Sequence, residues 1–169
     1  MKIHISIVLT SLLFLFLVGC TGNAEQETQD ENIETIDAVL QNALNGPDEE
    51  MKEVLRSDNM EDTVQYDKEH YEPYFANETA YMEFVNSYGT VLMIAPFRNE
   101  YTLQINNVEY EKTDSDETIY NFSVDLQYQK EGAEDSEVAV VKGQANLNEE
   151  HKIKDILVKT EDLWGILDE

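Results

Sequence analysis

The sequence predicts an α+β domain in which N-terminal helices pack on a curved antiparallel sheet of about four strands. Two observations support this fold class. Apolar residues recur at helical spacing between residues 33 and 88, whereas from residue 100 they alternate with polar residues. The connections between the alternating segments are short and rich in turn-forming residues, which favours consecutive antiparallel strands. Helices followed by an antiparallel sheet define the α+β class.

Three helices are predicted in the first part of the chain. The first ends at Asn45-Gly46-Pro47, a sequence that stops helices. The second has acidic residues at its N-terminal end and Arg56 at its close, which suits the helix dipole. The third follows Asn77, a suitable N-cap, and presents an aromatic stripe. Their apolar positions are Ile33, Ile36, Leu40, Ala43 and Leu44, then Met51, Val54 and Leu55, then Tyr81, Phe84, Val85 and Tyr88.

Two segments of this helical part have no clear period. Residues 57–76 are mixed and acidic, with several aromatic residues. Residues 90–95 contain the apolar run Val91-Leu92-Met93-Ile94, which fits either a buried strand or the continuation of a helix. The sequence leaves both alternatives open.

Four strands are predicted after residue 100. The first slips by one residue, between the alternation that ends at Ile105 and the one that resumes at Val108. The clearest strand covers residues 118–129, and residues 138–147 and 153–158 supply two more. The inward positions of the strand over residues 118–129 are Tyr120, Phe122, Val124, Leu126 and Tyr128. A final apolar group is expected to close an end of the core: Leu163, Trp164, Ile166 and Leu167.

The first twenty residues predict export. An apolar run from Ile5 to Val18 follows a short head with Lys2, and it is too short for a spanning helix of about 20 residues. The run ends in Leu17-Val18-Gly19-Cys20, which resembles the lipobox of bacterial lipoproteins. The resemblance implies that Cys20 carries a diacylglyceryl anchor and becomes the first mature residue. The open alternatives are an uncleaved anchor helix and an ordinary secretory signal.

The predicted organisation therefore has three parts. Residues 1–19 are a signal peptide, residues 20–32 are the lipidated Cys and a flexible tether, and residues 33–169 are one α+β domain. The tether is predicted because Thr21–Asn32 contains no large apolar residue and cannot bury enough surface to order itself. Cys20 is the only cysteine, so no intramolecular disulfide can form.

Charge excludes some partners. The chain has 36 acidic and 11 basic residues, a net charge of −25, and cleavage before Cys20 would remove Lys2 and leave −26. Nucleic-acid binding depends on clustered Lys and Arg, so no nucleic-acid partner is expected. A strong electrostatic hold on anionic lipid is not expected either. An acidic surface keeps an exported protein soluble.

The sequence contains no recognisable catalytic or metal-binding motif. His70 and His151 lie in acidic, loop-like contexts without HExxH spacing, so they are interpreted as surface residues, and neither metal nor cofactor is predicted. No serine lies in a GxSxG motif. Asp114, Asp116 and Glu117 share one predicted turn that could hold Ca²⁺ loosely, but a solvated hairpin tip is the preferred interpretation.

The element order over residues 33–163 resembles the cystatin-like or NTF2-like fold, which small lipoproteins of Gram-positive bacteria often adopt. Enzymes of the NTF2-like fold place Asp or His inside an apolar cone. Here the predicted inward face of residues 118–129 has no such side chain, and Asp125 lies on the opposite face. Asp155 interrupts its strand and is the remaining candidate for an inward acid.

These observations predict a non-enzymatic lipoprotein on the extracytoplasmic face of the cell membrane that binds a protein or peptide of the envelope. The alternative is a small-molecule carrier or isomerase-like enzyme that uses the concavity of the sheet. A large apolar pocket with a convergent acid would favour that alternative, whereas a filled core would favour the binding module. A third hypothesis is a passive structural lipoprotein without a partner.

Overall fold

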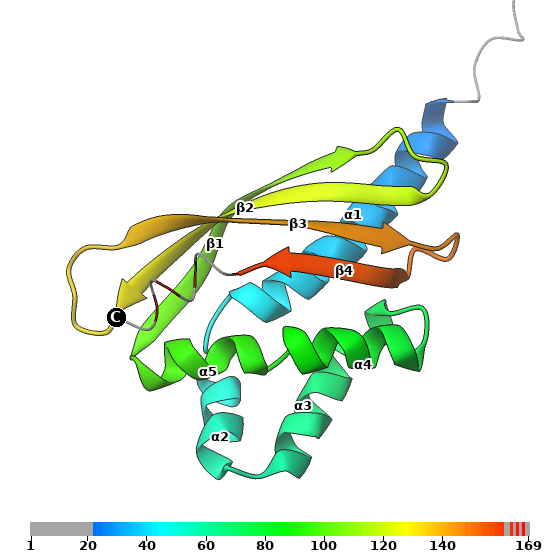
Figure 1. The fold of residues 1–169 in the computed structure, drawn as a ribbon. Helices are drawn as coiled ribbons and strands as arrows, with labels where there is room; N and C mark the ends of the chain where they lie inside the picture. The colour runs from blue at the N-terminus through cyan, green and yellow to red at the C-terminus, as the bar shows by residue number, and fades with distance from the viewer. Residues whose placement is uncertain (1–21, 161–162, 164, 166, 168–169) are drawn as a thin grey trace, which may run out of the picture.

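The computed structural model describes residues 22–160, 163, 165 and 167, and for residues 22–30 only the backbone. The predicted signal peptide and Cys20 lie outside the described residues, as do Trp164 and Ile166. Figure 1 shows helices on one side of a curved sheet. In chain order the elements are α1 (Gly22–Leu44), α2 (Glu49–Ser57), α3 (Met60–Tyr71), the 3₁₀-helix η1 (Glu72–Tyr74), α4 (Glu78–Ser87), α5 (Val91–Arg98), β1 (Tyr101–Lys112), β2 (Thr118–Lys130), β3 (Glu137–Leu147) and β4 (Ile153–Lys159).

The sheet is a four-stranded antiparallel meander in the order β1-β2-β3-β4. The predicted α+β fold class is therefore confirmed, and so is the internal position of β2. The predicted slip in β1 is a register shift between Ile105 and Asn107. One extra residue there moves the apolar alternation back onto the inner face.

The inner face of the sheet is filled by apolar side chains. Tyr120, Phe122, Val124 and Leu126 of β2 are buried, while the polar residues between them are half-buried on the other face. Phe122 pairs with Gly143 of β3, and a glycine there leaves room for the aromatic ring. The half-buried Tyr128 completes the predicted inward set.

The helices cover this inner face. α1 runs across the sheet (Figure 1) and buries Ile36, Val39 and Leu40. α1 and α5 contact β1, and α4 contacts β4. Leu163 and Leu167, from the predicted apolar tail, are buried in the same core. None of the helices among the described residues is both long enough and apolar enough to cross a membrane.

The structure resolves the two segments that lacked a period. Residues 60–71 form α3, which begins where the Asn59 side chain accepts a hydrogen bond from the Glu61 N–H. Residues 91–98 form α5, so the apolar run is helical. Leu92 and Met93 are buried whereas Val91 is exposed, and burial on most sides explains why the run shows no one-sided period.

The predicted start of the first helix is corrected. α1 begins at Gly22, so the segment predicted as a tether is helical from that residue onward. Glu, Gln and Ala are good helix formers, and a helix already fixed by its buried half extends at little cost. Asn32 is only 2% exposed, so this last residue of the predicted tether packs against the domain.

Candidate binding surface on the helical layer

Side-chain caps fix a short helical hairpin below the sheet. The Asp48 carboxylate accepts a hydrogen bond from the Met51 N–H at 2.8 Å and caps the start of α2. Asp58 ends α2 in the left-handed conformation, with φ of 49°. Met51 is the buried residue of α2. Val54 and Leu55 are partly buried against the core, and the other side chains of α2 reach the surface.

Asp67 joins this hairpin to α5. Its carboxylate is 7% exposed and accepts hydrogen bonds from the Thr90 N–H at 2.9 Å and the Thr90 hydroxyl at 2.7 Å. Burial raises the pKa of Asp67, and the two bonds from Thr90 offset part of that rise. Gly89 permits the approach, since a Cβ atom there would lie 2.9 Å from Asp67 Oδ1. The N-terminus of α5 is thus held against α3.

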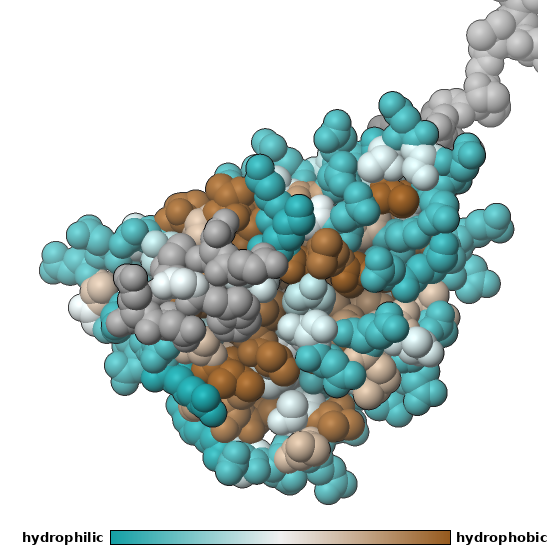
Figure 2. Space-filling view, viewed as in Figure 1, coloured by the Kyte–Doolittle hydropathy of each residue, from teal (hydrophilic) through white to brown (hydrophobic). Residues whose placement is uncertain are grey.

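An apolar hollow of about 310 Å³ lies between α2, α3 and α5. Met60 is 81% exposed and Val91 is 42% exposed, large values for apolar side chains that line one depression. Figure 2 shows hydrophobic side chains gathered over α5 and α2 within a hydrophilic surround. The apolar lining consists of Val54, Leu55, Met60, Val91, Ile94 and Phe97.

A polar groove of about 660 Å³ adjoins the hollow and shares Phe97 with it. It runs between α2, the end of α5 and the adjoining ends of β1 and β2. Arg56 lies over the Phe97 ring, with 5.9 Å from Cζ to the ring centroid. Lys130 Nζ lies 5.2 Å from the centroid of Tyr101. The groove also contains acids, Glu49, Glu100 and Glu131.

Basic residues concentrate at these two depressions. Lys52, Arg56 and Lys130 line the groove and Arg98 lines the hollow, so four of the 11 basic residues, including both arginines, lie there. Lys52 forms an ion pair with Glu49 at 2.9 Å. Within the described part of the chain, no carboxylate oxygen lies within 4.0 Å of the charged nitrogens of Arg56, Arg98 or Lys130. Arg56 adds to the effect of Lys52 in lowering the pKa of Glu49, so part of its charge already acts on that acid.

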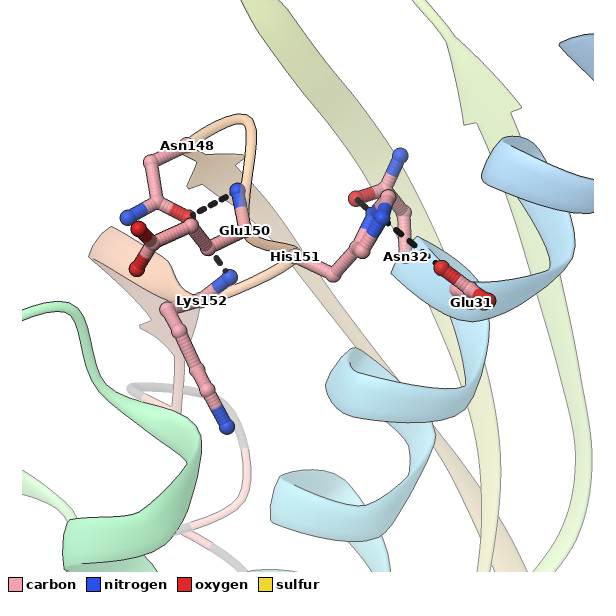
Figure 3. A network of polar contacts seen from close by, with 6 residues as sticks. All are labelled: Glu31, Asn32, Asn148, Glu150, His151 and Lys152. Atoms are coloured by element: carbon pink, nitrogen blue, oxygen red, sulfur yellow. Dashed lines mark hydrogen bonds and ion pairs between the residues drawn. The ribbon is translucent and has the colours of Figure 1, made fainter.

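His151 lies in a second polar site, between α1 and the turn that joins β3 to β4 (Figure 3). Its Nε2 lies 2.7 Å from Glu31 Oε2, and its Nδ1 lies 3.0 Å from Asn32 Oδ1. Both ring nitrogens of His151 therefore already have a polar partner within the protein. The arrangement ties α1 to the β3–β4 turn and corrects the interpretation of His151 as a simple surface residue.

The other candidate residues do not converge. His70 lies on α3 rather than in a loop and stacks on Tyr66, with 3.9 Å between ring centroids. Asp114 and Asp116 are exposed, while Glu117 contacts Asn146 and Lys154. Among the described residues, no group of three or more His, Cys, Asp or Glu side chains is arranged to hold a metal ion.

Asp155 is exposed, so the suggestion of an inward acid is wrong. The register shift opposite Asn146 and Leu147 adds a residue to β4, and this places both Lys154 and Asp155 outside. Asp125 pairs with Asn107 and Val140 on the outer face, as the alternation predicted. Asp67 is the buried carboxylate among the described side chains, and it belongs to the helical layer rather than the sheet.

Comparison with known proteins gives little further guidance. No protein-family model matches the chain, and no curated protein matches it. Among solved structures it is similar to TraH from the Gram-positive conjugative plasmid pIP501, solved by NMR in solution, with a TM-score of 0.48 and 11% sequence identity. That alignment covers 78% of this chain and 93% of TraH. Similarity at this level carries no argument about function, which must come from the residues.

Proposed function

We propose that the protein is an extracytoplasmic lipoprotein, anchored through Cys20, whose domain binds a protein or peptide of the envelope at the apolar hollow and polar groove. The exposed apolar lining of the hollow carries the binding half of this proposal. Large exposed apolar depressions with a polar rim are typical of interaction sites. The Leu17-Val18-Gly19-Cys20 motif carries the anchoring half.

The position of the surface supports the same function. α1 begins at one end of the fold, whereas the α2–α3 hairpin and the α5–β1 junction lie at the other (Figure 1). A protein anchored near Gly22 would therefore present the hollow and groove away from the membrane. The filled inner face of the sheet argues against the alternative of a carrier or isomerase in the concavity, since Tyr120, Val124 and Leu126 are each 0% exposed.

The anchoring half is tested by replacing the lipidated residue. Cells expressing the natural chain should incorporate labelled fatty acid into the protein, and Cys20→Ala should abolish the label. The variant should also remain uncleaved or leave the membrane fraction. Labelling of Cys20→Ala at the level of the natural chain would contradict the assignment.

The binding half is tested by a photo-crosslinking residue placed at Met60 in intact cells. We expect a discrete higher-mass adduct, because Met60 is 81% exposed at the edge of the hollow. The matched control places the same residue at Val138, which is apolar and 57% exposed but lies on β3. No adduct at Met60, or the same adduct at both positions, would contradict binding at the hollow.

A further inference from the structure

We infer that the bound partner is an apolar-acidic protein segment, with an apolar side chain in the hollow and carboxylates directed to Arg56 and Lys130 in the groove. This inference rests on the proposed function and names the chemistry of its ligand. It follows from the adjacency of the two depressions, which share Phe97. One continuous segment can therefore reach both.

The hollow requires an apolar anchor. Val54 and Leu55 pack against the core but remain only partly buried. Ile94 and Phe97 are also partly buried, and Met60 is open to solvent. A side chain inserted between them would be removed from water on several sides. Burial of one Leu- or Phe-sized side chain contributes roughly 1.5–3 kcal/mol, which makes such a residue the dominant contact of a short segment.

The groove supplies fixed cations for carboxylates. Arg56 lies over the ring of Phe97 and Lys130 lies over the ring of Tyr101, and these cation–π contacts favour positions of the two exposed side chains at the groove. Groups that are positioned in advance lose less conformational entropy on binding. Lys52 differs because it forms a close ion pair with Glu49, whereas Arg56 acts on the same acid only from a longer distance. The available positive charge therefore points to Arg56 and Lys130 as the carboxylate contacts.

The strongly acidic remainder of the chain limits what else can bind. Charges more than about 8 Å away are largely screened at physiological salt, so a carboxylate close to Arg56 responds mainly to the local cations. Glu49, Glu100 and Glu131 line the same groove. They repel a ligand whose carboxylates lie opposite them instead of opposite the basic residues. A second copy of the chain would bring another net charge of −25, which disfavours self-association here.

The test uses the full-length protein held in nanodiscs of neutral phosphatidylcholine and panned against a random peptide library displayed on phage. We expect the enriched peptides to combine large apolar residues with Asp or Glu. A synthetic copy of one enriched peptide should bind the Arg56→Glu/Lys130→Glu variant at least about tenfold more weakly, since each charge-assisted contact is worth about that factor. Panning against that variant should instead enrich Lys- or Arg-containing peptides.

The matched control is Lys142→Glu/Lys159→Glu, which changes the net charge equally but alters exposed cations of β3 and β4. Its affinity for the same peptide should stay within about twofold, because distant exposed charges are screened. Thermal melts show whether both variants are folded. Peptides without acidic enrichment, no peptide above empty nanodiscs, or equal losses in both double variants would overturn the inference. If Met60 still crosslinks a partner in cells, the proposed function stands and only the ligand chemistry is wrong.

Discussion

The sheet and the helical layer are stabilised in different ways. On the inner face of β2, Phe122 and Val124 pack against apolar neighbours, and the strand alternates with half-buried polar residues outside. In the helical layer, side-chain hydrogen bonds fix the ends of the helices: Asp48 caps α2, Asn77 caps α4, and Asp67 holds α5. Both regions bury apolar side chains in the same core, and the helical layer adds capping and buried polar contacts to that packing.

This difference matters for binding. A surface that leaves Met60 and Val91 exposed gains little stability from them, so the elements that carry it need other support. The Asp48 and Asn77 caps and the Asp67–Thr90 contact provide part of that support, and the last of these holds the Thr90 side chain, which itself lines the hollow. The sheet acts as the frame, and the helical layer presents the binding surface.

The largest expected loss comes from emptying the inner face of β2. Phe122→Ala should reduce the free energy of unfolding by about 3–5 kcal/mol, the usual range for removal of a buried aromatic side chain. Ser123→Ala, on the outer face, should change it by no more than about 0.5 kcal/mol. Denaturant melts of both variants measure the difference. Equal losses would show that both faces of the sheet are buried, which would remove the contrast drawn here.

A second loss, of about 1–3 kcal/mol, is expected from overpacking the same site. In Gly143→Ala the new Cβ atom would lie 2.1 Å from Phe122 Cζ and 2.2 Å from the Leu157 carbonyl oxygen, so the ring and the β4 backbone must both move. Gly165→Ala is the control, because among the described residues no atom beyond its own stretch of helix lies within 4 Å of a Cβ atom there. A Gly143→Ala variant as stable as the natural chain in thermal melts would contradict tight packing across β2 and β3.

The sequence predicted the sheet well because the alternation of apolar and polar residues along a strand indicates which of its side chains are buried. The period of two over residues 118–129 corresponds to alternating burial along β2. The slip after Ile105 corresponds to the register shift in β1. α3 was not predicted because few of its residues contact the core: Tyr66 and Tyr71 are buried, but Val64 is 56% exposed. Its amphipathic pattern is correspondingly weak.

The candidate surface could not be predicted from the sequence. Arg56 and Lys130 are far apart in the chain, and only the packing of α5 between α2 and the β1–β2 ends brings them to one groove. Asp67 looked like one more surface acid in an acidic chain, although it is buried against Thr90. Local patterns report burial of a segment, whereas a site made by three elements leaves no periodic signal.

An intermediate effect is expected at Asp67, in the helical layer. Asp67→Ala should cost about 1–3 kcal/mol, because the buried Thr90 N–H loses its acceptor. Asp67→Asn keeps an oxygen acceptor and serves as the matched variant, which should lose less. Denaturant melts at neutral pH compare the three proteins. Equal losses for Ala and Asn would mean that the charge, rather than the hydrogen bonds, holds α5.

The pH dependence of the same pair has a defined sign. Burial raises the folded-state pKa of Asp67 above its ordinary value of 3.8, so the folded protein binds this proton more tightly than the unfolded chain does. The stabilisation of the folded state by this tighter proton binding is present below pH 3.8. It is lost as the pH rises through the folded-state pKa of Asp67. The stability of Asp67→Asn relative to the natural chain should therefore increase over that rise. A decrease would mean that the Thr90 bonds and the N-terminus of α5 favour the carboxylate.

The smallest expected effects on stability come from removing one buried tyrosine hydroxyl in each of the two regions. Tyr120 in β2 and Tyr71 in α3 are both 0% exposed. The Tyr71 hydroxyl donates a hydrogen bond to the Asn42 carbonyl oxygen at 3.0 Å, whereas the described residues give the buried Tyr120 hydroxyl no partner. Tyr71→Phe should therefore cost about 0.5–1.5 kcal/mol, the net value of one hydrogen bond.

Tyr120→Phe removes a polar atom that folding desolvates without compensation, so it should be neutral or stabilise the protein by up to about 1 kcal/mol. The two variants delete the same atom from side chains of equal burial, so their difference in denaturant melts isolates the hydrogen bond. Equal costs would show that the Tyr120 hydroxyl is satisfied in solution. In that case the inner face of the sheet would also depend on a polar contact, and the division between a packed frame and a polar-supported binding layer would weaken.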